Sequence, residues 1–232
     1  SDIHAGGLNL IFPHHENEIA QSCCAQDQKK MARYWLHNGF VRMNNEKLSK
    51  SLGNIISVTD AANQYRGETL RAALLAAHYR APLDLSDKVM RDARNGLDRL
   101  YRAAGGVVAS QDNADAGFIN CLLDDLNTPA AMARLHELAR LSNKGDDAAA
   151  KALKASAAVL GLLQQSADGW AKAGDVAADD GLDDAAIDSL IDERKQARAN
   201  REFAKADEIR DQLTNAGITL EDSADGTIWR RR

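Results

Sequence analysis

The spacing of apolar residues predicts helices over most of the chain. From Ser86 onward, apolar residues recur every three or four positions, which is the period of a helix with one buried face. Thr128 is the expected N-cap of one of these helices, with Pro129 at its first helical position. Short connections between such helices predict an antiparallel helical bundle over residues 85–165. The apolar stripes include Leu97, Leu100, Phe118, Leu123, Leu135, Leu138, Leu153 and Leu163.

The N-terminal part predicts a mixture of strands and helices. The apolar run at residues 8–12 predicts a short buried strand, which Pro13 ends. Pro13 can also open a helix, and residues 14–37 read as mainly helical. Residues 40–43 predict another strand. Further elements expected here are a turn at Asn44-Asn45, a helix capped by Ser57 or Thr59, and a helix over about 68–78.

The C-terminal part predicts a small α+β domain. Residues 166–182 are rich in Asp, Gly and Ala and have little periodicity, so they read as a linker. Two helices are expected next, one around Ile187–Ile191 and one over Phe203–Leu213. Asn215-Ala216-Gly217 is typical of a helix stop, and the alternating residues 218–229 predict a hairpin.

Composition narrows the class of protein. Only three prolines occur in 232 residues, which favours a mainly helical fold. The net charge is −5, so the chain is not expected to coat nucleic acid by bulk charge, and DNA is not an expected partner. Residues 1–110 carry 14 basic and 11 acidic side chains, whereas the remainder carries 15 and 23. A nucleic-acid partner would therefore be held by local patches.

The cysteines and the first residues of the chain indicate the cellular compartment in which the protein is expected. Cys23, Cys24 and Cys121 are an odd number with one adjacent pair, which is no disulfide framework, so a reducing, cytoplasmic compartment is expected. No apolar run is long enough to span a membrane, and no signal-peptide pattern opens the chain. Because the sequence opens at Ser1 without an initiator Met, we expect a fragment of a longer protein.

A short lysine-rich loop is the first candidate site. Lys47-Leu48-Ser49-Lys50-Ser51 places two ammonium groups and two hydroxyls in a stretch of small residues before Leu52-Gly53-Asn54. Such a loop can close over a polyphosphate, because its charges and hydrogen-bond donors meet charge that develops on the phosphates. A solvated basic turn is the alternative interpretation of the same five residues.

A second candidate lies in Phe12-Pro13-His14-His15-Glu16-Asn17-Glu18. If a helix opens at Pro13, His14 and Glu18 lie four residues apart on one face, where an imidazole and a carboxylate can both bind zinc. His15 would point elsewhere, toward the substrate or toward a metal ligand. Two ligands are too few for a stable zinc site. The alternative is an ordinary capped helix start.

Four segments taken together resemble one family. The segments DIHAGG, FPHHENEIAQS, YWLHNGFV and EKLSKSLGN, in this order, are similar to the cysteinyl-tRNA synthetases, which are class I aminoacyl-tRNA synthetases. The tail segments FAKADEIRD and GTIWRR resemble the same family. The implied fold is mainly α with α/β: the C-terminal part of a Rossmann-like catalytic domain (1–43), a stem-contact region with the KMSKS loop (44–84), an antiparallel helical bundle (85–165), a linker (166–182) and a small α+β anticodon-binding domain (183–232).

The resemblance implies a zinc site that recognises cysteine. His14 and Glu18 match two of the family's four zinc ligands, whereas the other two are cysteines expected upstream of Ser1. Cys23 and Cys24 do not match them and are expected to be small buried residues. His4 and His15 are assigned to the amino-acid pocket. Zinc binds thiolate strongly, so it would separate cysteine from serine, which differ only by sulfur for oxygen. Ala5 replaces a family glycine.

The resemblance also implies ATP chemistry at the lysine loop. Lys47, Ser49, Lys50 and Ser51 match the family's KMSKS loop, with Leu48 in place of Met, a change that conserves volume. Lys50 and Lys47 are the residues expected at the phosphates of ATP, which enters with Mg²⁺. The opposing HIGH motif is absent from the 232 residues and is expected upstream. The fragment alone is therefore expected to be inactive.

The tail is assigned to the anticodon of tRNA(Cys). Arg198, Asp207 and Asp222 match family positions near anticodon bases, and Trp229 is open to two roles, a base-stacking platform or a core residue. Two other functions remain open. One is a cysteine ligase of mycothiol synthesis that acts on an amino-sugar glycoside. The other is a tRNA-binding fragment without catalysis.

Overall fold

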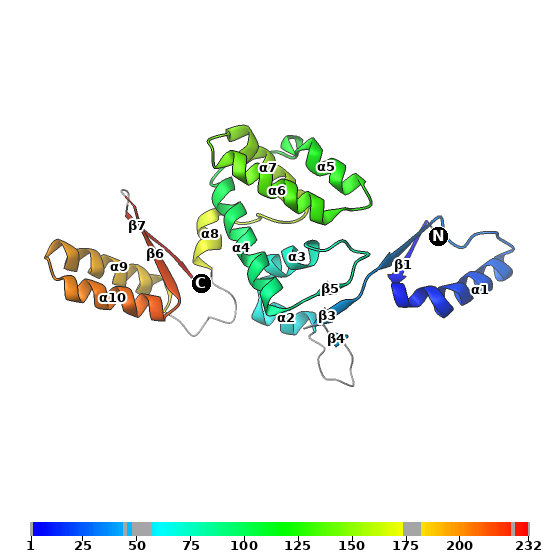
Figure 1. Cartoon of the computed structure of the whole chain (residues 1–232), viewed down its shortest axis with the longest axis horizontal. Helices are drawn as coiled ribbons and strands as arrows, with labels where there is room; N and C mark the ends of the chain where they lie inside the picture. Colours follow the sequence, from blue (N-terminus) through cyan, green and yellow to red (C-terminus); the bar gives the residue numbers. More distant parts are fainter. Residues whose placement is uncertain (1, 44–45, 48–56, 174–181, 224–225, 232) are drawn as a thin grey trace.

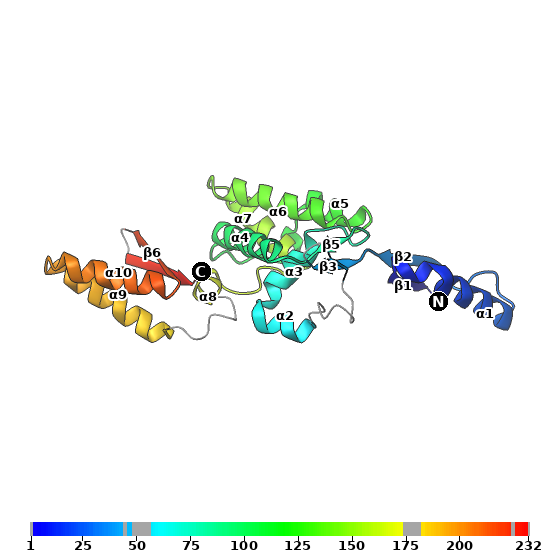
Figure 2. The same cartoon turned by 60° about the horizontal axis from the view of Figure 1, so that its bottom comes forward.

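The computed structural model describes residues 2–43, 46–47, 57–173, 182–223 and 226–231. Its elements form three groups in a row (Figure 1). A strand–helix–strand unit lies at one end, helices α2 to α8 lie in the middle, and a helical hairpin with a β-hairpin lies at the other end. Figure 2 shows the same order from a second direction. The described residues are mostly helical, as the sequence predicts.

The N-terminal unit pairs two distant strands in parallel. Strand β1 (Ile3–Gly7) pairs with β2 (Tyr34–Asn38), with Ile3 opposite Tyr34 and Gly7 opposite Asn38. Helix α1 (Glu16–Gln26) lies in the connection and ends at Asp27, whose φ of 47° is left-handed. A crossover of this kind is how parallel neighbours are joined.

Two predictions for this unit are wrong. Residues 8–10 form a short 3-10 helix instead of a buried strand, and Phe12 is 77% exposed. Residues 34–37 are strand where a helix was expected. For residues 34–37 the pairing partner, β1, lies far along the chain, and local apolar spacing carries no information about it.

A three-stranded sheet follows, with the order β4-β3-β5. Strand β3 (Val41–Met43) pairs antiparallel with β4 (Glu46–Lys47) and parallel with β5 (Leu83–Asp84). The prediction of a strand over 40–43 is confirmed, and the turn predicted at 44–45 lies outside the described residues. At Gly39 an added Cβ would lie 2.2 Å from the Ala81 carbonyl oxygen, so only glycine lets these two backbones approach.

The predicted helices α2 and α3 are present. Helix α2 (Val58–Gln64) begins after Ser57, which forms a capping box with Asp60, so Ser57 rather than Thr59 is the N-cap. Helix α3 (Gly67–Leu75) covers most of the predicted range.

Four of the central helices contribute most of one hydrophobic core. They are α4 (Asp87–Ala104), α5 (Ala116–Leu123), α6 (Thr128–Ser142) and α7 (Asp147–Val159), joined by short connections after α5 and α6. Helix α4 begins where the predicted helical pattern begins, and Ser86 is its N-cap. The core contains many of the predicted apolar positions, including Leu97, Leu100, Phe118, Leu135, Leu138 and Leu153. These side chains are almost fully buried and supply the apolar area that stabilises the fold.

The N-cap of α6 differs from the prediction. Asn127, not Thr128, is the cap, because its side chain accepts a hydrogen bond from the Ala130 amide. Thr128 is the first helical residue, and its hydroxyl donates to the Ala77 carbonyl oxygen at 3.2 Å. The Thr128 side chain therefore binds the segment that follows α3 instead of capping α6.

The stretch read as a linker contains helix α8 (Ala167–Lys172). Trp170 in this helix is 2% exposed and stacks on Tyr101, with ring centroids 4.7 Å apart. Its indole N–H donates to Asp98 at 2.6 Å. The Asp-, Gly- and Ala-rich composition hides this helix because a single tryptophan, rather than a periodic stripe, holds it on α4.

The tail has the predicted α+β architecture. Helices α9 (Asp184–Ala199) and α10 (Phe203–Asn215) precede the antiparallel hairpin of β6 (Ile218–Ser223) and β7 (Gly226–Arg231). The helix stop is confirmed at Gly217, whose φ of 75° favours glycine. Ile187, Ile209, Leu213, Ile218 and Trp229 form a second buried cluster, separate from the central core.

Candidate amino-acid and metal site

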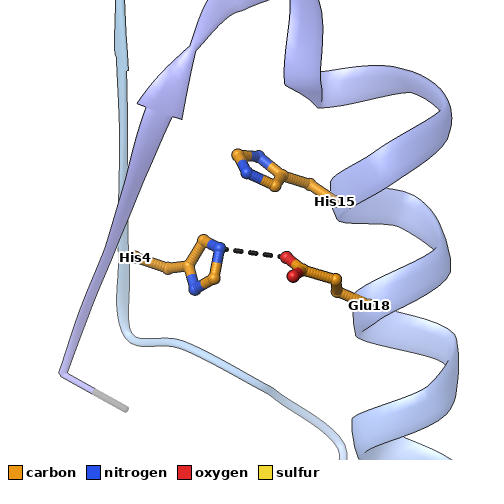
Figure 3. A group of neighbouring side chains, drawn as sticks. All are labelled: His4, His15 and Glu18. Carbon is orange, nitrogen blue, oxygen red and sulfur yellow. Dashed lines mark ion pairs between the residues drawn. The ribbon is translucent and has the colours of Figure 1, made fainter.

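The N-terminal unit brings four histidines and one carboxylate together. His4 lies on β1, His14 and His15 lie on the turn Ile11–His15, Glu18 lies on the first turn of α1, and His37 lies on β2. Figure 3 shows His4 reaching from the strand toward the helix that carries His15 and Glu18. Parallel pairing of β1 with β2 places the strand histidines beside the helix start.

The Glu18 carboxylate lies between two imidazoles. Its Oε1 is 3.3 Å from His14 Nε2, four residues earlier, and its Oε2 is 3.1 Å from His4 Nε2. Oε2 is buried but accepts no hydrogen bond of acceptable geometry from the described residues. A buried carboxylate oxygen in this state is available to a cation.

These distances fit a zinc ion. Two donors that each lie about 2.0–2.1 Å from a tetrahedral zinc are roughly 3.3 Å apart, close to the His14–Glu18 separation. His4, His15 and Glu18 also form a group whose ligand atoms all lie within 4.8 Å of one another. The His14 side chain is 58% exposed, so the His14–Glu18 pair is open to further ligands. The donor set therefore fits the metal that the resemblance implies.

His15 occupies a different position from His14. It is only 3% exposed, and its Nδ1 lies 2.9 Å from Nε2 of His37, so one of the two rings donates to the other. Burial, followed by the charges of His4 and His37, lowers the pKa of the His15 imidazole and favours its neutral form. His4 packs edge-on against His15, with ring centroids 4.8 Å apart.

Gly6 makes room for this ring. An added Cβ at Gly6 would lie 2.9 Å from Leu10 Cδ1 and 3.0 Å from His15 Cε1. The missing side chain at Gly6 thus allows a close approach to the backbone, and the group that approaches is the imidazole of His15.

Trp35 and His37 also belong to this cluster, although the sequence did not predict a role for either. Their rings stack with centroids 6.1 Å apart and an interplanar angle of 10°. Trp35 also lies 4.8 Å from the His4 ring, measured between centroids. Trp35 and His37 are two residues apart on one strand, so they face the same side of the sheet. A prediction of residues 34–38 as a strand would therefore have placed both side chains on one face.

The cysteines lie outside the cluster. All three are free; Cys24 is exposed, and Cys23 and Cys121 are half-buried. The expectation that Cys23 and Cys24 are buried is therefore wrong, because α1 buries none of its residues completely in this chain.

The lysine loop is only partly within the described residues. Lys47 is the last residue of β4, with its backbone opposite Arg42 of β3. Ser49, Lys50 and Ser51 lie outside the described residues. Their assignment to ATP phosphates remains a prediction.

The tail residues occupy three different environments. Arg198 is exposed in the last turn of α9, and Asp207 is exposed on α10, 3.4 Å from Arg210. Asp222 lies on β6 opposite Thr227. Trp229 is 4% exposed, its indole N–H donates to Asp188 at 2.7 Å, and Lys172 lies over its ring. Because the Trp229 ring is covered, Trp229 is a core residue. The alternative role, a platform on which a base stacks, is therefore corrected.

Comparison with known proteins decides the family. The family model described as tRNA synthetases class I (C) catalytic domain matches residues 1–95, and the DALR domain matches 117–164. The model described as Cysteinyl-tRNA ligase anticodon binding domain matches 179–230. A Cysteine--tRNA ligase of Saccharophagus degradans is 49% identical over 99% of this chain. The chain belongs to the cysteinyl-tRNA synthetase family.

Two further members of the family have similar identities to this chain, and all three relatives are about twice its length. The Cysteine--tRNA ligases of Rhodospirillum rubrum and Acidiphilium cryptum are 48% and 47% identical over 99% of the chain. The chain covers 52% of the Saccharophagus and Rhodospirillum proteins and 50% of the Acidiphilium protein, about half the length of these relatives.

Solved structures add little to this assignment. The Agrobacterium radiobacter K84 LeuRS, in a ternary complex with tRNA and LeuAMS, aligns over 69% of this chain and 24% of its own, with a TM-score of 0.49 and 18% identity. A likeness this small carries no argument about function. Among the described residues, no helix combines the length and apolarity needed to cross a bilayer.

Proposed function

We propose that this chain supplies the metal-binding pair, the lysine loop and the anticodon-reading tail of an enzyme that joins cysteine to tRNA(Cys). The observation that carries the proposal is the Glu18 carboxylate, held between His14 and His4 within the segment that the catalytic-domain model matches. The reaction consumes ATP and passes through cysteinyl-adenylate. The free cysteines agree with a cytoplasmic setting.

His14 and Glu18 would hold zinc, with further ligands from outside this pair. When bound, zinc favours the cysteine thiolate over the serine hydroxyl, because it is a borderline-soft ion with high affinity for sulfur. The residues around it fix the geometry. His4 contacts the second Glu18 oxygen, and the buried His15 imidazole, hydrogen-bonded to His37, would form a polar wall beside the substrate.

Lys47, Ser49, Lys50 and Ser51 would act on ATP. The cysteine carboxylate attacks the α-phosphorus, the bond to the bridging oxygen breaks, and pyrophosphate leaves with the added negative charge. Ammonium and hydroxyl groups at this loop, together with Mg²⁺, stabilise that charge. A hydroxyl of the terminal ribose of the tRNA then attacks the cysteinyl carbonyl, and AMP leaves.

The tail would recognise the anticodon through Arg198, Asp207 and Asp222. Carboxylates accept hydrogen bonds from base amino groups, and a guanidinium binds base edges or stacks on them. The tail also distinguishes the two ligase candidates. The anticodon-binding model matches 179–230, which favours a tRNA enzyme over the ligase that joins cysteine to an amino sugar.

The anticodon assignment is tested by binding of tRNA(Cys) to the chain. We expect a tRNA(Cys) with an altered anticodon to bind about tenfold more weakly, the effect of losing one good base contact of about 1–3 kcal/mol. Fluorescence anisotropy with both RNAs measures the difference. Equal affinities for the two RNAs would contradict the anticodon assignment and would favour the amino-sugar ligase.

The third candidate, a tRNA-binding fragment without catalysis, describes this polypeptide when it is alone. The 232 residues contain no HIGH motif. Of the four zinc ligands that the resemblance implies, they contain only His14 and Glu18. We expect no cysteine-dependent ATP–pyrophosphate exchange above a no-enzyme control. Exchange that depends on cysteine and is abolished by a Lys50→Ala change would contradict this expectation.

A further inference from the structure

A hollow of about 610 Å³ opens between α4 and α6, far along the chain from the histidine cluster. It opens to solvent, and the helices that form it lie side by side in the middle of the molecule (Figure 1). Every titratable side chain that lines it is basic. The lining residues are Arg99, Arg102, His136, Ala139, Arg140 and Asn143.

The three guanidinium groups have no acidic partner among the described residues. Arg102 Nε donates only to the Asp98 carbonyl oxygen of its own helix, at 3.2 Å. Two other arginines of the same helices are paired: Arg94 with Asp98 at 3.1 Å, and Arg134 with Asp115 at 2.8 Å. The hollow thus gathers three arginines that have no such carboxylate partner among the described residues.

One acidic side chain of α4 that interacts with Arg99 is already hydrogen-bonded elsewhere. The pKa of Asp92 is lowered chiefly by a hydrogen bond from Lys88 at 2.7 Å, with Arg99 a minor cause. Asp92 therefore does little to neutralise Arg99.

His136 is placed in the hollow by close helix packing. A Cβ added at Gly96 of α4 would lie 3.7 Å from His136 Cε1, at ordinary van der Waals contact, so the imidazole lies close against α4. Burial and the Arg99 charge lower the pKa of His136, as expected for an imidazole in a positive field. Two arginines of α4 thus face a histidine and an arginine of α6.

Helix termini explain only part of this arrangement. Arg102 and Arg140 lie in the last turns of α4 and α6, where a cation complements the helix dipole. Arg99 and His136 lie one turn earlier. Stabilising two helix ends does not require three guanidinium groups and an imidazole to line one hollow.

We propose that this basic hollow binds phosphate groups of an RNA backbone. Guanidinium forks pair with phosphate oxygens bidentately, and an open hollow suits a polymer that passes across it. A net charge of −5 leaves local patches as the means of holding a polyanion. The inference rests on the proposed function, in which the RNA is tRNA(Cys), and adds a contact that is independent of sequence, away from the anticodon.

The test compares two double variants of this chain. Arg99→Gln/Arg140→Gln removes two cations from the hollow, and Lys30→Gln/Lys151→Gln removes two exposed cations elsewhere. Affinity for tRNA(Cys) is measured by anisotropy over a range of KCl concentrations. We expect the hollow variant to flatten the slope of log affinity against log salt by about 2 and to weaken binding roughly tenfold at moderate salt. The lysine control should change both much less.

The outcomes separate this inference from the proposed function. If both double variants change the slope equally, or neither does, the hollow is not a phosphate site. If the hollow variant behaves as expected but the parent chain ignores the anticodon, the anticodon assignment fails and the hollow stands. Failure of the parent to bind any tRNA overturns both. Arg140→Gln alone, with an expected slope change of about 1, and circular dichroism show whether unfolding explains the result.

Discussion

At the scale of single residues, the Glu18 carboxylate is the centre of the candidate metal site. It receives His14 from its own helix start and His4 from the strand beside it, at 3.3 and 3.1 Å. Imidazole nitrogens and carboxylate oxygens are both metal ligands, so the three side chains together offer a donor set to a cation.

The first prediction concerns this carboxylate. Glu18→Gln should weaken binding of Zn²⁺ to the chain roughly tenfold or more, because the charged oxygen donor becomes a neutral amide. Glu16→Gln is the control: it removes the same charge from an exposed residue of the same helix turn. Isothermal titration with Zn²⁺ measures both. Equal weakening by the two changes would show that only local charge matters.

At the scale of elements, one carboxylate locks α5 to α6. Asp115 caps α5 by accepting from the Phe118 amide at 2.8 Å, and it receives Arg134 of α6 through Nε and Nη2 at 2.8 and 2.9 Å. The Asp115 amide donates to Ser156 of α7 at 2.9 Å. One residue therefore ties three helices together.

The second prediction follows from this lock. Hydrogen bonds from Arg134 hold the pKa of Asp115 below its ordinary value of 3.8. The stabilisation is therefore present above pH 3.8 and is lost as the pH falls through the lower, folded-state pKa. Asp115→Asn should reduce the free energy of unfolding by about 2 kcal/mol at neutral pH, and the difference should shrink toward acid.

Urea unfolding across the pH range measures the effect of this change. The exposed Asp112→Asn is the control, with an expected effect within about 0.5 kcal/mol. A difference between Asp115→Asn and the parent that stays constant down to acid pH would show that the charge of Asp115 contributes nothing.

At the scale of the whole molecule, the central helices and the tail have separate cores. Helix α8 lies between them: Trp170 packs into the central core, whereas Lys172 lies over Trp229 in the tail. Each of the three regions holds one of the three tryptophans, Trp35, Trp170 and Trp229. Fluorescence can therefore report the regions separately.

The third prediction uses this arrangement. Leu213 is fully buried in the tail core, so Leu213→Ala should destabilise the tail by about 2–5 kcal/mol and leave the central helices nearly unchanged. In a background that retains only Trp229, the fluorescence transition should move to lower urea. In a background that retains only Trp170, it should stay in place.

Leu135→Ala, in the central core, is the reciprocal control and should move the Trp170 transition. If Leu213→Ala moves both transitions together, the two cores unfold as one unit, and α8 transmits stability between them.

The sequence by itself determined the features that neighbours along the chain control. The helical period from Ser86, the two cap candidates Ser57 and Thr59, and the stop at Gly217 are all read within a few residues, because helix hydrogen bonds and caps are local. The order of short segments was also enough to indicate the family. His14 and Glu18 could be paired because four residues is one helical turn.

Tertiary structure alone decided what depends on distant partners. The strand over 3–7 exists because residues 34–38 pair with it, and this pairing brings His4 to Glu18 and His37 to His15. Trp170 became core and Trp229 lost its free ring faces through contacts with other helices. The basic hollow likewise needs α4 beside α6. Such contacts depend on which surfaces meet after folding, and no local period or spacing in the sequence encodes that choice.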